Sequence, residues 1–130
     1  MASKVSDDVI DAALNLIINN AGTRVACSAE PTDYSDATTD DGNGGVRIGS
    51  TAISAGDFTG PADGDTSGRK VTVPQQTGVS VNVSGDVTHE AIVDDNNSRL
   101  LHVTTVPTTS VTTDGTMTLA SRDHEIRDPS

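Results

Sequence analysis

The chain has 130 residues, of which 33% are hydrophobic, and its 19 Asp and Glu against 8 Lys and Arg give a formal net charge of −11. So few bases cannot form the clusters that bind phosphate backbones or anionic membranes, and we expect no nucleic-acid or membrane partner. One Tyr and one Phe are too few for the stacking platforms of carbohydrate or single-strand binders. We expect a single acidic domain over residues 1–130 with a thin core.

The first predicted element is an amphipathic helix over about residues 6–21. Ser6 stands at the N-cap position, Val5 is placed to pack on Ile10, and Gly22 is expected to end the helix in the left-handed conformation. The apolar positions recur at intervals of three and four: Val9, Ile10, Ala13, Leu14, Ile17, Ile18 and Ala21. Because the polar face carries Asp and Asn, packing on the protein's own β-sheet is favoured over binding to a membrane or partner.

The remainder is predicted to be β-structure, interrupted by an acidic loop at about residues 30–45. Phe58 is expected to anchor in the core, and the tail from Asp123 is mostly charged. The predicted strands are residues 23–29, one or two within 46–53, 69–73, 79–83, 87–93, 100–106 and, as the last, 116–119. The fold class is therefore mainly β with an N-terminal amphipathic helix, as an antiparallel β-sandwich or small barrel.

Residues 77–106 are predicted to form a three-strand meander. The last two strands flank the turn-forming residues 94–98 and read as a β-hairpin. If the hairpin loop has four residues, Asp94 pairs with Arg99 and His89 lies diagonally near His102. A shift of one residue in register would place the two histidines on opposite faces.

Sequence spacing offers little support for a metal site. His89, His102 and His124 have no short-spaced partner and are expected to be satisfied or exposed, not zinc ligands. Cys27, next to Val25 and Ala26, is expected to be a small buried hydrophobe.

Asp63, Asp65 and Ser67 are weak calcium-ligand candidates, because oxygen ligands at alternating positions begin calcium loops. The EF-hand pattern fails at its twelfth position, which is Pro74, so an acidic turn leading into a strand is the preferred interpretation. The Asp- and Gly-rich run at residues 40–45 is a weaker case.

No G-x-S-x-G elbow or Walker loop is present, and we expect neither enzymatic activity nor a cofactor. The apolar stretches are too short for a membrane span, which predicts a soluble protein made in a cytoplasm.

Several segments together resemble a family of small virion proteins from tailed bacteriophages: the helix followed by CSAEPTDY at 27–34, DFTGPADGDTSGRKV at 57–71, THEAIVD at 88–94 and DHEIRDP at 123–129. The resemblance implies a capsid decoration, or cement, protein on the outer surface of the virion. Such a subunit is small and β-rich. It binds the major capsid protein in many copies, as single subunits or as a homo-oligomer, and bridges capsomers.

In that role, the candidates for contact with an acidic shell are Arg69, Lys70, Arg122 and Arg127, with ordinary solvated charges as the alternative. The alternative functions are a phage tail or head-to-tail component and, less favoured, a calcium-binding β module.

Overall fold

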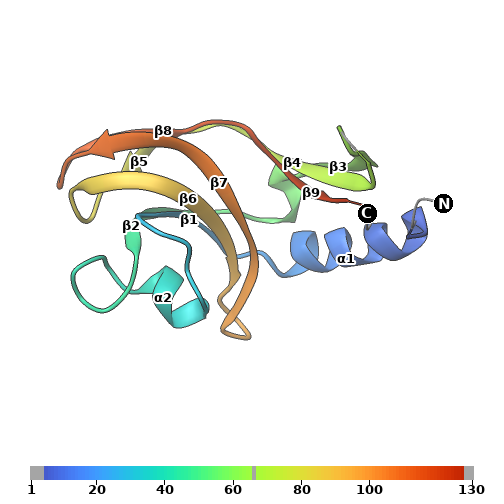
Figure 1. Cartoon of the computed structure of the whole chain (residues 1–130), viewed down its shortest axis with the longest axis horizontal. Coiled ribbons are helices and arrows are strands. Elements are labelled where there is room, and N and C mark those ends of the chain that lie inside the picture. The colour runs from blue at the N-terminus through green and yellow to red at the C-terminus, as the bar shows by residue number, and fades with distance from the viewer. Residues whose placement is uncertain (1–4, 66, 128–130) are drawn as a thin grey trace.

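The computed structural model describes residues 5–65 and 67–127, and the predicted fold class is confirmed: a mainly antiparallel β structure with an N-terminal helix (Figure 1). The largest sheet has the strand order β2-β1-β6-β7, with all neighbours antiparallel. Its strands are β1 (Thr23–Cys27), β2 (Arg47–Ala52), β6 (Gly85–Asp94) and β7 (Arg99–Val111).

Two smaller antiparallel sheets form a second layer. One has the order β3-β4-β9 and the other pairs β5 with β8. Their strands are β3 (Thr59–Asp63), β4 (Arg69–Val73), β5 (Gln76–Ser80), β8 (Thr116–Leu119) and β9 (Arg122–Ile126). In Figure 1 this layer runs above the curved β6 and β7, and the short helix α2 (Tyr34–Thr38) lies below them. The large sheet is thus covered on both faces.

Helix α1 (Asp7–Asn20) packs one face on the protein's own β4 and β3, as predicted. The Ser6 side chain accepts a hydrogen bond from the Asp8 N–H at 3.2 Å, which confirms it as the N-cap. Val5 and Phe58 are half-buried against the cluster around α1, as expected for a staple and an anchor. That cluster contains Ile10, Leu14, Ile17, Ile18, Ile53, Val71, Val73 and Ile92.

The predicted left-handed end of this helix at Gly22 is wrong. The C-cap is Ala21 in an extended conformation, and the chain passes directly into β1. Gly22 donates its N–H to the Val93 carbonyl at 2.9 Å, and a Cβ on Gly22 would lie 2.6 Å from an oxygen of Asp95. A larger residue at this position would require the Asp95 side chain, which binds Thr23 and Tyr34, to move.

The predicted three-strand meander is also wrong. β5 pairs with β8, where Val79 lies opposite Met117, while β6 pairs with β1 and β7. Val79 and Val81 pack with Ile48, Met117 and other members of a second cluster, so hydrophobic contacts distant in sequence select the partner strand. Alternation predicted a strand that includes Val79, but β5 ends at Ser80 and not at Val83, and alternation carries no information about the neighbouring strand.

The predicted β6–β7 hairpin is confirmed: its loop has four residues, and Asp94 pairs with Arg99 as expected for that loop length. The Asp94 side chain is buried and closes this loop: it accepts hydrogen bonds from the backbone of Asn96 and Asn97 and from the Arg99 guanidinium at 2.9 Å. Bonds from Asn97 and Arg99 hold the pKa of Asp94 below its usual value, against the effect of burial.

A register irregularity between Ile92 and Val93 changes which histidines meet. His102 lies opposite Ile92, whereas His89 lies opposite Thr105. Since cross-strand partners share a face, His89 and His102 lie on opposite faces of the sheet, as in the shifted alternative.

Four elements were not predicted, namely α2, the short 3-10 helix η1 (Ala55–Asp57), β3 and β9. Helix α2 lies inside the predicted acidic loop and buries only Ala37, although Asp33 caps it. β9 lies in the predicted charged tail, so β8 is not the last strand, and β9 buries only His124. Elements that bury one side chain leave no periodic apolar pattern in the sequence.

The remaining core divides into two clusters besides that of α1. One lies between the layers at the opposite end of the sheet: Ala26, Ile48, Val79, Val81, Val87, Val106, Met117 and Leu119. The other lies under α2: Val25, Cys27, Ala37, Ala91 and Val93.

No helix in residues 5–65 and 67–127 has the length and apolarity to cross a membrane.

Candidate functional site

The structure brings the four basic residues predicted to contact a partner onto one sheet. Arg69 and Lys70 lie on β4, Arg122 on the neighbouring β9, and Arg127 directly after β9. The register places Lys70 opposite Glu125 and Val73 opposite Arg122. Residues more than 50 positions apart in sequence therefore share one charged strip of paired strands, in which Arg69 and Arg122 lie on the face that carries Val71 and His124, and Lys70 lies on the other face.

Each base of this strip is paired with a carboxylate of its own chain. Arg69 contacts Asp11 of α1 at 2.8 Å and Asp63 of β3 at 2.7 Å, so it ties the helix to the sheet. Lys70 contacts Asp65 at 2.7 Å and Asp123 at 3.0 Å. These bonds raise the pKa of both bases.

The same holds for the other basic residues. Arg122 lies 3.5 Å from Glu90, and Arg127 lies 2.6 Å from Glu125. The ion pairs of the described residues include all seven of their Lys and Arg side chains: Arg24, Arg47, Arg69, Lys70, Arg99, Arg122 and Arg127. The strip therefore presents neutralised bases to any partner.

Of the weak calcium candidates, Asp63 is the last residue of β3, and Asp65 and Ser67 lie in the β3–β4 connection, at the edge of this strip. Asp63 and Asp65 bind Arg69 and Lys70, and Ser67 follows two residues later. The Asp65 N–H also donates to the Glu125 carboxylate. Within residues 5–65 and 67–127, no group of three or more His, Cys, Asp or Glu side chains is placed to hold a metal ion.

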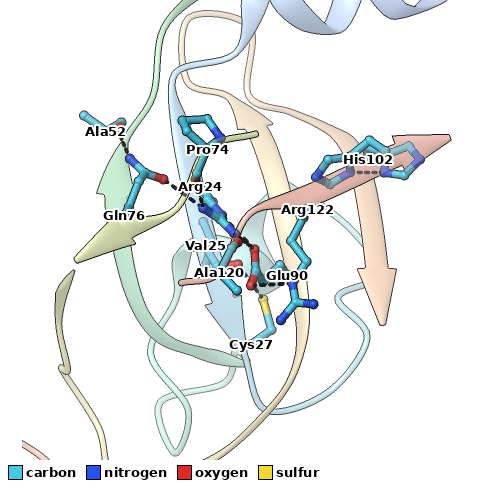
Figure 2. Close-up of polar contacts among 11 residues, drawn as sticks. Arg24, Val25, Cys27, Ala52, Pro74, Gln76, Glu90, His102, Ala120 and Arg122 are labelled. Atoms are coloured by element: carbon cyan, nitrogen blue, oxygen red, sulfur yellow. Dashed lines mark hydrogen bonds and ion pairs between the residues drawn. The ribbon is translucent and has the colours of Figure 1, made fainter. Parts of the chain in front are cut away.

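The interior holds a polar centre that the sequence did not predict, built on Arg24 of β1 (Figure 2). Its Nε donates to Glu90 at 2.7 Å, and Nη2 donates to the Ala120 carbonyl at 2.5 Å. Nη1 donates to the Pro74 carbonyl at 3.0 Å and to the Gln76 side chain at 3.1 Å. One guanidinium thus joins the large sheet to both segments that link the smaller sheets.

Glu90 is the counterpart of Arg24 and is also buried. It receives Arg24 on one oxygen and Arg122 on the other. Burial lowers the pKa of Arg24, and Glu90 opposes that effect. A charged residue within an otherwise apolar strand, as in TRVAC and HEAIV, was the available signal for this pair.

A histidine pair lies beside this centre. Nδ1 of His102 on β7 and Nδ1 of His124 on β9 are 2.6 Å apart, and the rings meet edge to face. Burial lowers the pKa of His102, and burial together with the charges of His102 and Arg24 lowers the pKa of His124 to about 3. Both rings are neutral near pH 7, so one Nδ1 donates to the other across the two layers.

The interior also contains a free thiol, Cys27, and a small cavity. The Cys27 thiol is buried, and burial raises its pKa to about 12, so the predicted small hydrophobe is confirmed and the thiolate is suppressed. A cavity of about 150 Å³ between β7 and β8 is lined largely by apolar side chains, with Glu90 and Arg122 beside them. It is below the size of an ordinary small-molecule site.

The outer face of α1 is the remaining surface feature. Val9, Ala12, Ala13 and Leu16 recur at helical spacing and are all exposed. Val9 is 60% exposed and Leu16 48%, and they are the exposed large hydrophobic side chains of the described residues. The sequence placed Val9 and Ala13 on the same apolar face as Ile10. They instead belong to a second arc that the sheet does not cover.

Comparison with protein-family models, with curated proteins and with solved structures finds no match for this chain.

Proposed function

We propose that this protein is a structural virion component, a capsid decoration protein that binds the outer shell of a bacteriophage in many copies. It would act on the major capsid protein and stabilise the shell by bridging capsomers. The observation that carries the proposal is the exposed apolar arc of α1, defined by Val9, Ala12, Ala13 and Leu16. An uncovered apolar helix face beside polar surface is typical of a protein-binding site.

The way in which α1 is held supports the same role. Ile10, Leu14 and Ile17 fix the inner face of the helix in the core, and Asp11 anchors its flank to Arg69 at 2.8 Å. A pre-positioned helix loses little conformational entropy when its outer face is covered. A subunit that bridges capsomers needs a rigidly held contact helix, because force on its contact with the capsid must be transmitted through α1 to the sheets.

The Arg24 centre supports the proposal from inside the molecule. Arg24 and Glu90 link the two layers through buried polar contacts, which resist shear between the sheets. The resemblance of four sequence segments to small phage virion proteins gives the same class of function.

The experiment adds purified protein to capsids that lack it and measures co-sedimentation and the temperature at which the capsids release their contents. The proposal predicts saturable binding and a higher release temperature. Binding to isolated tails without binding to shells would instead assign a tail or head-to-tail role. Failure to bind either particle would contradict the proposal.

A further inference from the structure

We infer that the surface covering α1 is an apolar patch on the capsid shell whose rim consists of Lys and Arg side chains. This inference rests on the proposed function and assigns the polarity of the partner. The basic residues in the sequence predict that bases of this chain contact an acidic shell. We instead place acidic residues on this chain and basic residues on the shell.

The first step is size. A helix of 14 residues is about 21 Å long, and one face of it is far smaller than the roughly 800 Å² that each partner contributes to a stable protein interface. A stable partner must therefore cover the surroundings of α1 as well as Val9 and Leu16. The charge of those surroundings then decides which partner fits.

The second step is charge. Helix α1 and three of the elements that contact it, η1 (Ala55–Asp57), β3 and β4, carry five carboxylates and two bases, and β6, which also contacts α1, adds Asp86, Glu90 and Asp94. The bases are Arg69 and Lys70, and both already hold carboxylates. Asp7, Asp8 and Asp57 are exposed and form no ion pair with any described residue. The border of the apolar arc is therefore acidic.

The third step is desolvation. A partner that covers Asp7, Asp8 or Asp57 removes water from a carboxylate that no described base neutralises, which is unfavourable unless the partner supplies a base. The described part of a second copy offers no uncommitted base for this purpose, because all seven of its Lys and Arg side chains form internal ion pairs. A symmetric dimer through α1 would also bring two acidic borders together. A basic rim on a different protein fits the surface.

The experiment compares Leu16→Asp with Asn15→Asp in co-sedimentation with capsids that lack the protein. The two variants add the same charge at adjacent exposed helix positions, but only Leu16 belongs to the apolar arc. We expect Leu16→Asp to weaken binding about tenfold or more, with Asn15→Asp close to the parent protein. Circular dichroism confirms that both variants keep the helix.

Polarity is tested by a second matched pair. Asp7→Asn with Asp8→Asn removes two charges at the arc, and Glu30→Gln with Asp114→Asn removes two exposed charges elsewhere. The first pair should weaken binding several-fold and flatten its salt dependence, while the second should have little effect.

The outcomes are distinguishable. If the parent protein does not bind capsids, the proposed function fails and this inference fails with it. If the parent binds but Leu16→Asp binds equally well, or if removing Asp7 and Asp8 strengthens binding, the inference alone is overturned. Concentration-dependent dimers that Leu16→Asp abolishes would assign the face to a second copy and would also overturn it.

Discussion

Arg24 and Arg127 each lie 2.6 Å from a glutamate, but in opposite surroundings. The side chains of Arg24 and Glu90 are 0% and 3% exposed, whereas those of Arg127 and Glu125 are 64% and 12% exposed. The buried guanidinium also holds Pro74 and Gln76 at the β4–β5 connection and Ala120 in the β8–β9 connection. Arg127 contacts one neighbouring carboxylate two residues away.

The difference teaches what an ion pair does in each place. In the interior, removing one partner leaves a charge without water, so the pair fixes the geometry of the layers. At the surface, water replaces the lost partner, and the pair contributes little to stability. It still neutralises a base, which leaves the uncompensated exposed charge of the molecule acidic.

The largest expected effect is that of Arg24→Met. It leaves Glu90 buried with only Arg122 at 3.5 Å, and breaking a buried pair in this way costs about 3–5 kcal/mol. Urea unfolding followed by circular dichroism measures the loss. The double variant with Glu90→Leu should recover part of it, and a loss below about 1 kcal/mol in Arg24→Met would contradict a buried, structural pair.

The next effect is a fall in stability below pH 6.5. The folded pKa of His124 is about 3 against an ordinary value of 6.5, so only the unfolded state gains a proton in this window. Stability is complete above pH 6.5 and falls as the pH decreases, by about 1.4 kcal/mol per unit for each such histidine once the pH is well below 6.5. Hydrogen bonds lower the pKa of Asp94 and of Asp123 from the ordinary value of 3.8. The stability that these two carboxylates contribute is therefore lost at lower pH than the stability that His124 contributes.

Urea unfolding between pH 7.5 and 4.5 measures this slope. His124→Leu should remove most of it, because the buried imidazole is then absent. A slope that survives His124→Leu unchanged would place the titrating group elsewhere.

Arg69→Met should act locally. Arg69 joins α1 to β4 through Asp11, but the core contacts of Ile10 and Leu14 remain. We expect faster amide hydrogen exchange in α1, while the midpoint of global unfolding changes less than in Arg24→Met. Equal protection of α1 in the variant and the parent would show that the ion pair does not hold the helix.

The smallest effect is expected for Arg127→Met. Its exposed pair with Glu125 joins residues two positions apart and links no two elements. The midpoint of thermal unfolding should therefore stay unchanged. Capsid binding should also persist, since this base is already neutralised. Loss of binding would restore Arg127 as a shell contact of the kind expected from the sequence.

Local patterns in the sequence were sufficient for much of the fold. The N-cap at Ser6, the period of α1 and the four-residue hairpin loop after Asp94 follow from residues close together in the chain. β4 and β8 were likewise predicted with their observed bounds. Short-range propensity and periodicity carry this information.

What the sequence could not provide depends on distant partners. Pairing of β5 with β8 follows from packing between Val79 and Met117, and the role of Arg24 follows from Ala120, 96 residues away. The basic candidates were identified one by one, but the carboxylates that neutralise them, such as Asp11 for Arg69, come from other elements. The exposed arc of α1 was hidden because Val9 and Ile10 are adjacent, and only the position of the sheet decides which is covered.

The central claim is that this acidic, internally cross-linked sandwich serves as a repeated shell component. The most direct test is its copy number in purified virions, measured by quantitative mass spectrometry against the major capsid protein. The account predicts a ratio of one or a simple fraction of one. A count of a few to a few dozen copies per particle, or absence from the particle, would contradict it.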